Sequence, residues 1–429
     1  MSDSILIQGG RVLDASTRHD AIADLLIENG KITALDKPGQ IPASRAKKVI
    51  QAKGSWVMPG FIDVHVHLRE PGLEYKETIA TGTAAAVAGG FTSVACMANT
   101  QPVNDNPFIT AFIREQARKT GLCRVFPIGA VSKGLQGKEL AEIGGMVSEG
   151  ARAISDDGMP VMNALLMRRA MEYALAFGVP VISHAEDANL SNQGVMNEGH
   201  TSCCLGLRGN PSASEEIMVA REIALSRLTG CPLHIAHVSS KLSLEHIRRA
   251  KEDGLHVTAE VSPHHLSLTE ESLRAYETRF KVAPPLRMME DVEALKIALK
   301  DGLIDMIATD HAPHGLIDKE VELDTAAFGM IGLQTAVAVT LELVHEGRLP
   351  LMRWLDSLTV KPAKLLGVPH GSLAIGRDAD ITVFDAEARI QFSEDRILSR
   401  SKNSPFLGRD LRGVVKATLV GGHLAYETH

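Results

Sequence analysis

Apolar and polar positions alternate along the 429-residue chain in a pattern that predicts a parallel sheet. Between about residue 56 and residue 365, short apolar runs alternate with longer stretches, such as 243–253 and 291–300, whose apolar residues recur at helical spacing. Such alternation is typical of βαβ units. The eight apolar runs, each ending in polar or ionisable residues, are WVMPGFIDVHVHL, FTSVACMAN, CRVFPIGAV, ARAISDD, VPVISHAED, LHIAHVSS, HVTAEVSPHH and IDMIATDHAPH. Eight strands close a (β/α)8 TIM barrel, so we expect an α/β fold of this kind.

The two ends of the chain have a different pattern, of short strands and tight turns. Residues 1–55 contain ILIQGGRVLD and ADLLIENGKITALD, with Asn29-Gly30 as a hairpin turn. Residues 366–429 contain DADITVFD and VVKATLVGGHLAYE, with β-branched alternation and a Gly-Gly turn. We therefore predict that these two segments pair into one small β-module, outside a barrel formed by residues 56–365. Two ends on separate modules would contradict this prediction.

Composition and charge narrow the classes of function. With 45% hydrophobic and 23% charged residues, the chain is typical of soluble globular proteins. Its formal net charge of -7, without a cluster of Lys and Arg, argues against a nucleic-acid partner. The N-terminus lacks a basic region followed by an apolar one, and no apolar stretch of about 18 residues occurs. We expect no membrane association and a cytoplasmic location.

The five cysteines do not indicate a disulfide framework or a thiolate zinc site. Their number is odd and they lack paired C-x-x-C spacing. Buried free thiols are therefore expected at Cys96, Cys123, Cys203, Cys204 and Cys231.

A His-x-His pair, His65 and His67, ends the first apolar run. Side chains at positions i and i+2 of a strand share one face, with Cα atoms roughly 6.6 Å apart, so both rings can reach one metal ion. Taken alone, the pair fits equally well as two histidines hydrogen-bonded on a polar strand face.

Four later runs also end in residue types that bind metals. In a barrel these strand ends lie on one face, where active sites are built. Any one of them could be an ordinary hydrogen-bonded polar group, but together they predict a metal site. The residues are Asp156 and Asp157, His184, His237, and Asp310. Imidazole with carboxylate suits Zn²⁺ best, although Mn²⁺, Co²⁺ or Fe²⁺ would also accept such a set.

The motifs DVHVHLREPG, MANTQPVND, SDDG, SHAED, IAHVSS, EVSPHH, APPLR and TDHAPH occur in this order in class I dihydroorotases. The chain resembles that family, a branch of the amidohydrolase superfamily, over essentially its whole length. The resemblance implies a metal-dependent hydrolase barrel. It also implies reversible interconversion of L-dihydroorotate and N-carbamoyl-L-aspartate in de novo pyrimidine (UMP) biosynthesis.

The resemblance also implies two zinc ions bridged by a carboxylate. His65, His67 and Asp310 would hold one zinc, and His184 and His237 the second. Many relatives bridge their metals with a carboxylated lysine after strand four, where this chain has Ser155-Asp156-Asp157-Gly158. By its position in the pattern Asp157 is the expected bridge, with Asp156 as a supporting group. If that inference failed, Lys133 after strand three would be the alternative.

The chemistry implied by the resemblance is attack of a zinc-bound hydroxide on the ring carbonyl. Zinc lowers the pKa of bound water toward about 7 and polarises the carbonyl. Asp310 is the expected general base and acid, which takes the proton of the nucleophile and passes it to the leaving nitrogen. The alternative is that Asp310 is a metal ligand without a part in proton transfer.

Substrate contacts follow from the same resemblance. A carboxylate substrate calls for a bidentate cation, for which Arg69 is placed two residues after the His-x-His pair. The full expected set is His67, Arg69, Asn99, His314, Phe328 and Gly329. Asn99 and His314 would also fit as a turn-forming Asn and a loop His. Ala283 replaces an Asn that usually binds substrate in the family, which weakens the substrate assignment; Ala98 and Gln334 are lesser departures.

Two rival functions remain open on the sequence. An allantoinase or hydantoinase would use the same metals on another ring, but such relatives usually carry the bridging lysine. A non-catalytic dihydroorotase-like subunit of an aspartate carbamoyltransferase complex would have lost metal ligands, whereas all six are present here. The expected partner is a small-molecule substrate, association with aspartate carbamoyltransferase stays open, and a homo-oligomer is expected.

Overall fold

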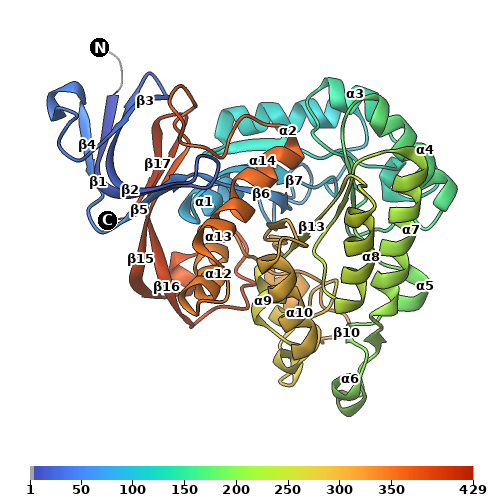
Figure 1. Cartoon of the computed structure of the whole chain (residues 1–429). Helices are drawn as coiled ribbons and strands as arrows, with labels where there is room; N and C mark the ends of the chain where they lie inside the picture. The colour runs from blue at the N-terminus through green and yellow to red at the C-terminus, as the bar shows by residue number, and fades with distance from the viewer. Residues whose placement is uncertain (1–3, 429) are drawn as a thin grey trace.

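The computed structural model describes residues 4–428, and they form a mixed α/β protein (Figure 1). Strands from both ends of the chain share one eight-stranded sheet, of order β17-β16-β15-β5-β1-β2-β3, with β4 paired to β1. In Figure 1 the blue N-terminal strands lie beside the red C-terminal ones. The expected pairing of the two ends is therefore present. The strands are β1 (Ser4–Asp14), β2 (His19–Glu28), β3 (Lys31–Asp36), β4 (Lys48–Gln51), β5 (Trp56–Pro59), β15 (Ile381–Gln391), β16 (Asp410–Val420) and β17 (His423–Glu427).

Two tight turns in this sheet confirm the turns predicted from the sequence. Asn29 and Gly30 connect β2 to β3 with φ values of 54° and 76°. Gly421 and Gly422 connect β16 to β17 with φ values of 55° and 78°. Positive φ at both central residues matches the twist of antiparallel hairpins, and Gly and Asn adopt it at low cost.

The first apolar run was predicted to be one strand, but it forms two. Residues 56–59 form β5, which pairs with β1 and β15 in the terminal sheet, and β6 (Phe61–Val66) begins after Gly60. At Gly60 a Cβ atom would lie 2.1 Å from Thr92 Cγ2, and the Gly60 N–H donates to the Asp380 carbonyl. The chain therefore passes from the terminal sheet to the parallel strands at a position where a side chain would collide with Thr92.

The remaining apolar runs pair in parallel around a closed circuit. β6, β7 (Phe91–Cys96) and β8 (Arg124–Pro127) form one sheet, and β9 (Val181–Ser183), β12 (Leu233–Ile235), β13 (Val257–Val261) and β14 (Met306–Ile307) form another. Ile154 joins the two sheets through parallel bridges to Gly129 and Val181. A parallel bridge between Val66 and His311 joins β6 to the segment after β14. All eight predicted runs thus contribute to the circuit, the fourth through the two bridges of a single residue, Ile154.

Helices connect these segments in the alternation that the sequence predicted. The predicted helices at 243–253 and 291–300 are confirmed as α8 (Lys241–Glu252) and α10 (Met289–Lys300). The other long helices are α1 (Ile79–Ala88), α2 (Pro107–Thr120), α4 (Ala164–Ala176), α7 (Ala213–Thr229), α12 (Ala336–His345), α13 (Leu351–Leu358) and α14 (Val360–Leu366). Among residues 4–428, no helix has the length and apolar character that a membrane span requires.

Shorter elements occupy the loops. They are the helices α3 (Ile143–Ser148), α5 (Ala188–Ser191), α6 (His200–Leu205), α9 (Pro263–Ser267) and α11 (Leu316–Lys319), the short strands β10 (Met196–Asn197) and β11 (Gly209–Asn210), and the 3-10 turns η1 (Ala43–Arg45), η2 (Lys133–Leu135), η3 (Glu270–Leu273), η4 (Thr278–Phe280) and η5 (Glu394–Arg396).

One apolar cluster takes residues from nearly every segment of the circuit. It contains Ile62, Ala95, Ile128, Ala153, Ile182, Ala236 and Met306, and Ala363 and Leu366 of α14 pack against them. A larger cluster packs the strands against the surrounding helices. The segments of the circuit are thus held by apolar packing, and their polar C-terminal ends are left for the site.

The cysteine prediction is only partly correct. All five are free, and Cys96, Cys123 and Cys231 are buried, but Cys203 and Cys204 are exposed. These two lie on α6, whose buried residues are Thr201 and Ser202. A six-residue helix that turns two small polar residues inward leaves its cysteines in solvent.

Candidate metal centre and adjoining cavity

The His-x-His pair at the end of β6 faces two carboxylates. The ring centroids of His65 and His67 are 5.4 Å apart, and both side chains are buried. His65 Nε2 lies 3.3 Å from Asp157 Oδ1 and 3.5 Å from Asp310 Oδ1. His67 Nε2 lies 3.2 Å from Asp310 Oδ1 and 3.5 Å from Asp157 Oδ2. The same two aspartates therefore approach both ring nitrogens.

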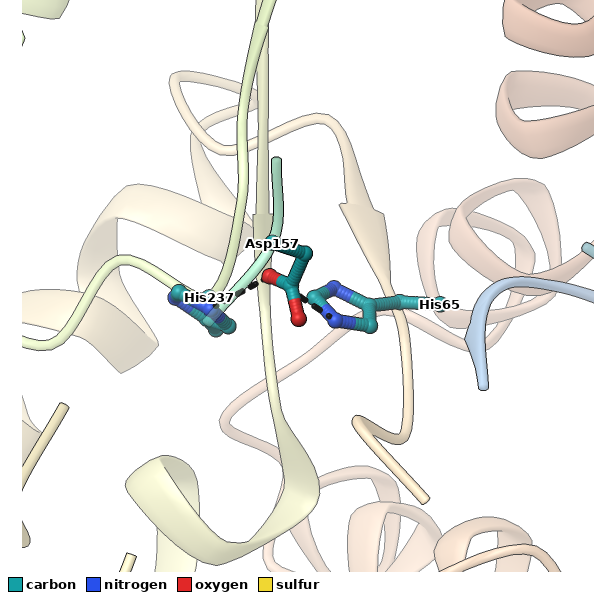
Figure 2. A group of neighbouring side chains, drawn as sticks. All are labelled: His65, Asp157 and His237. Carbon is teal, nitrogen blue, oxygen red and sulfur yellow. Dashed lines mark ion pairs between the residues drawn. The ribbon is translucent and has the colours of Figure 1, made fainter. Parts of the chain in front are cut away.

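Two further histidines approach Asp157 from the opposite side. His237 Nε2 is 3.4 Å and His184 Nδ1 is 3.6 Å from Asp157 Oδ1, and these two ring nitrogens are 2.9 Å apart. Figure 2 shows the Asp157 carboxylate between the rings of His65 and His237. The six residues predicted as metal ligands are therefore brought together, with Asp157 at their centre.

The donor atoms fit a bound divalent metal. The ligand atoms of His65, Asp157 and His237 lie within 4.8 Å of one another, as do those of His65, His67 and Asp310. Within residues 4–428, His65 Nε2 and Asp157 Oδ1 are buried without a hydrogen-bond partner. Unpaired buried polar atoms are costly, and a cation bound by imidazole nitrogen and carboxylate oxygen would satisfy both.

The backbone is unusual at three positions of the site. Arg69, His237 and Asp310 have φ values of 62°, 30° and 48°. Non-glycine residues rarely adopt this left-handed region, which costs about 1–3 kcal/mol each, and such strain concentrates at functional sites. The fold therefore maintains an unfavourable backbone where these side chains enter the site.

Asp156 and Lys133 have other partners. Asp156 Oδ1 accepts hydrogen bonds from the backbone N–H groups of Val131 and Ser132 at 2.7 and 3.0 Å, and its Oδ2 accepts one from the Ser132 hydroxyl. Burial raises the pKa of Asp156 to about 6. Lys133 Nζ donates to Glu139 Oε1 at 2.6 Å, on a side chain that is half exposed. Lys133, the alternative bridging residue, therefore points to the surface.

Two acids that hydrogen-bond to the ligand residues were not predicted from the sequence. Glu260 Oε1 accepts from His65 Nδ1 at 2.6 Å, and Glu260 Oε2 is 3.0 Å from His234 Nε2. Asp63 accepts from the backbone N–H groups of His65 and Thr309, both at 3.1 Å, and burial raises the pKa of Asp63 to about 7. The available signal was a charged residue within an apolar, buried run, as in FIDVHV and VTAEV.

Charge within the cluster favours ionised carboxylates. Burial disfavours the charged form of Asp157 and Asp310, but the histidines around them outweigh it and hold the pKa of both below the usual range. Both aspartates are therefore anionic at neutral pH.

A cavity of about 840 Å³ opens beside the cluster, and every residue predicted to bind substrate lines it. Besides Asp157, His184 and Asp310, its lining includes His67, Arg69, Asn99, His314, Phe328 and Gly329. Ala283 also lines it, which leaves an apolar methyl group where the family usually has an amide. A small ring compound would fit next to the metal-binding atoms.

The cationic side of this cavity is formed by Arg69 and its neighbours. Arg69 Nε donates to the Pro313 carbonyl, and Arg69 Nη2 is 3.3 Å from His314 Nε2. Burial lowers the pKa of Arg69 to about 10, so the guanidinium stays charged at neutral pH. Burial, followed by the charges of Arg69 and Lys76, lowers the pKa of His314. Asn99 has a second contact, because its Oδ1 lies 2.8 Å from His67 Nδ1.

Comparisons with known proteins agree on one family. Residues 54–243 match the model of a family described as dihydro-orotase-like. The chain is 50% identical to the dihydroorotase of Anaeromyxobacter dehalogenans, covering 100% of this chain and 99% of that one. It is also 50% identical to the dihydroorotase of Geobacter metallireducens, covering 99% and 100%.

Solved structures of a hydantoinase and a dihydropyrimidinase also match the chain, at lower sequence identity. The L-hydantoinase (dihydropyrimidinase) from Arthrobacter aurescens has a TM-score of 0.90 at 27% identity, covering 100% of this chain and 96% of that one. The dihydropyrimidinase from Brevibacillus agri has a TM-score of 0.85 at 26% identity, covering 98% and 94%. Since half of its residues are identical to those of dihydroorotases along its full length, the chain belongs to the dihydroorotase family.

Proposed function

We propose that the chain is a catalytically competent class I dihydroorotase. It interconverts L-dihydroorotate and N-carbamoyl-L-aspartate in de novo pyrimidine biosynthesis. The observation that carries the proposal is the convergence of six ligand-type side chains beside a cavity with a buried arginine, in a chain 50% identical to dihydroorotases.

Two zinc ions per chain are the proposed cofactors. His65, His67 and Asp310 would hold one ion, His184 and His237 would hold the other, and Asp157 would bind both. When bound, the metals supply a water of lowered pKa and polarise the ring carbonyl. The support lies in the distances of 3.2 to 3.6 Å between these ring nitrogens and the aspartate oxygens.

Asp310 is the proposed proton carrier. Its carboxylate is ionised at neutral pH, it lines the cavity, and it lies beside the metal-binding nitrogens. An anionic oxygen in this place can accept a proton from the attacking water and deliver it to the ring nitrogen that leaves.

Arg69 is the proposed anchor of the substrate carboxylate. Its guanidinium is charged, buried and open to the cavity, and it can bind a carboxylate through two parallel hydrogen bonds. Asn99, His314 and the backbone of Phe328 and Gly329 complete the substrate contacts, with His67 shared between metal and substrate. These groups orient the ring so that its carbonyl meets the nucleophile.

The closed circuit of parallel pairings supports a (β/α)8 TIM barrel. We propose the division predicted from the sequence, with residues 1–55 and 366–429 as the two parts of the small β-module and residues 56–365 as the hydrolase barrel, except that residues 56–59 join the β-module as strand β5. A homo-oligomer, a cytoplasmic location and association with aspartate carbamoyltransferase also stay predictions.

The competing activity is that of a hydantoinase, because solved structures that resemble the chain carry that name. Purified protein should be assayed with dihydroorotate, N-carbamoyl-L-aspartate, allantoin and a hydantoin, together with a zinc-to-protein ratio. We expect turnover of the first two compounds and about two zinc ions per chain. Turnover of allantoin or hydantoin alone would reject the proposal. An inactive protein without zinc, even after zinc addition, would favour the non-catalytic subunit.

A further inference from the structure

Glu260 contacts a proposed ligand of each of the two metal ions, His65 and His237. It is not hydrogen-bonded to any of the residues predicted to bind substrate. It lies on β13 and is 1% exposed. One oxygen, Oε1, accepts from His65 Nδ1 at 2.6 Å and from the His237 backbone N–H at 3.2 Å. Because His65 and His237 belong to different proposed ions, a single carboxylate oxygen contacts a ligand of each.

The other oxygen of Glu260 ends a chain of hydrogen bonds. His234 Nε2 lies 3.0 Å from Glu260 Oε2, and His234 Nδ1 lies 2.8 Å from Thr258 Oγ1. An ionised carboxylate only accepts hydrogen bonds, so His234 Nε2 carries a hydrogen. In the neutral ring, His234 Nδ1 then accepts from the Thr258 hydroxyl.

The same rule fixes the tautomer of His65. Because Glu260 Oε1 can only accept, His65 Nδ1 carries a hydrogen, which leaves Nε2 as the ring nitrogen that can bind a metal ion. His65 Nε2 is one of the buried side-chain atoms without a hydrogen-bond partner in the described chain, and it faces Asp157 and Asp310. His67 has the same arrangement, with Nδ1 at 2.8 Å from Asn99 Oδ1 and Nε2 toward Asp310.

We propose that Glu260 is a positioning residue that holds His65 in the tautomer able to bind metal and fixes the backbone of His237. The proposal rests on the proposed metal site. Groups that hydrogen-bond to a metal-bound histidine fix its orientation, and their loss typically reduces metal affinity about 10- to 100-fold. Glu260 differs from Asn99 in that its carboxylate is the stronger acceptor and reaches two ligands.

The test compares Co²⁺ binding to the metal-free wild type and to the variants Glu260→Leu and Glu260→Gln. Affinity is measured by competition with a chromophoric chelator, and the visible spectrum of bound Co²⁺ reports ligand geometry. We expect about 10- to 100-fold weaker binding and an altered spectrum in Glu260→Leu. Glu260→Gln keeps one carbonyl acceptor for His65 Nδ1, so we expect it to recover most of the loss.

Glu222→Gln is the matched control, because Glu222 is a fully buried carboxylate on α7 that pairs with Arg221 and has no contact with the ligands. It should bind Co²⁺ as the wild type does. Wild-type affinity and spectrum in Glu260→Leu would overturn the proposal, and so would a Glu260→Gln variant as weak as Glu260→Leu. If Glu260→Leu does not fold, unchanged affinity and spectrum in Glu260→Gln overturn it. A wild type that binds no metal would instead contradict the metal site.

Discussion

Asp157 lies where histidines from three different strand ends meet. His65 lies near the end of β6, His184 directly follows β9, and His237 lies two residues after β12. Each places a ring nitrogen 3.3 to 3.6 Å from Asp157 Oδ1. Asp156 cannot take this place because its two oxygens are bound to Val131 and Ser132. Of two adjacent aspartates, one therefore supports a loop and the other faces the histidines.

Asp310 differs from Asp157 in that its proposed role includes proton transfer. In Asp310→Asn the amide oxygen can still face His67, but the side chain cannot accept a proton. We expect kcat to fall by about 10²- to 10⁴-fold with measurable metal still bound. Steady-state kinetics and metal analysis test this. Asp301→Asn, at an exposed helix end, should retain full activity. Retained turnover in Asp310→Asn would remove Asp310 as the proton carrier.

The ligand types could be predicted at the residue scale because each follows directly after an apolar run. Glu260 and Asp63 stand out in the sequence only as charged residues within apolar runs. Their supporting role could not be predicted, because the one-dimensional pattern gives no partner for either. Their contacts join β13 to β6 and β6 to Thr309, positions far apart in sequence. Asn99 was predicted only as a substrate contact, and its hydrogen bond to His67 likewise depends on the approach of two strands.

At the scale of elements, the number of parallel segments could be predicted from the sequence, but the lengths of the strands could not. The run ARAISDD contributes only the bridges of Ile154, and β14 has two residues. The split of the first run at Gly60 depends on Thr92, thirty-two positions later, whose side chain occupies the space. Hydrophobic periodicity gives the existence of a strand, whereas its ends are set by tertiary contacts.

The segment that runs from α11 to Phe328, a residue that lines the cavity, is held by a buried lysine. Lys319 Nζ donates to the carbonyls of Thr278, Lys281 and Ala327 at 3.0, 3.3 and 2.6 Å. Burial is the main cause that lowers the pKa of Lys319 from 10.5 to about 7, and the charge of Lys281 lowers it further. A lysine thus fixes the backbone next to Phe328 and Gly329.

This lysine predicts a pH dependence of stability. Between about pH 7 and 10.5 the unfolded chain keeps a proton on Lys319 that the folded chain has lost. The free energy of unfolding therefore rises with pH, by up to about 1.4 kcal/mol per pH unit from this group. Lys319→Met should lack that rise when urea unfolding is measured at pH 7, 8 and 9. Lys364→Met, at an exposed position of α14, should follow the wild type. Equal slopes for wild type and Lys319→Met would contradict the prediction.

At the scale of the whole molecule, the terminal sheet and the parallel circuit are joined through β5. β15 pairs with β5, and the chain then turns at Gly60 directly into β6, which carries the His-x-His pair. The first ligand pair is therefore anchored to strands from both ends of the chain. The pairing of the two ends could be predicted from the short strands and tight turns that both contain. The position of β5 between strands from the two ends could not be predicted.

Because the proposed ligands come from five strand ends, metal binding should stabilise the entire fold. Removing the metals leaves His65 Nε2 and Asp157 Oδ1 buried without partners. A metal at 100 times its Kd adds about 2.7 kcal/mol to the free energy of unfolding. For a chain of this size we expect the Tm to fall by several degrees after dialysis against a chelator, in differential scanning calorimetry. Zn²⁺ should restore it, whereas Mg²⁺, which prefers oxygen ligands, should not. The double variant His65→Ala/His67→Ala should respond less to Zn²⁺, and an unchanged Tm in the metal-free wild type would show that the ions do not tie these strand ends together.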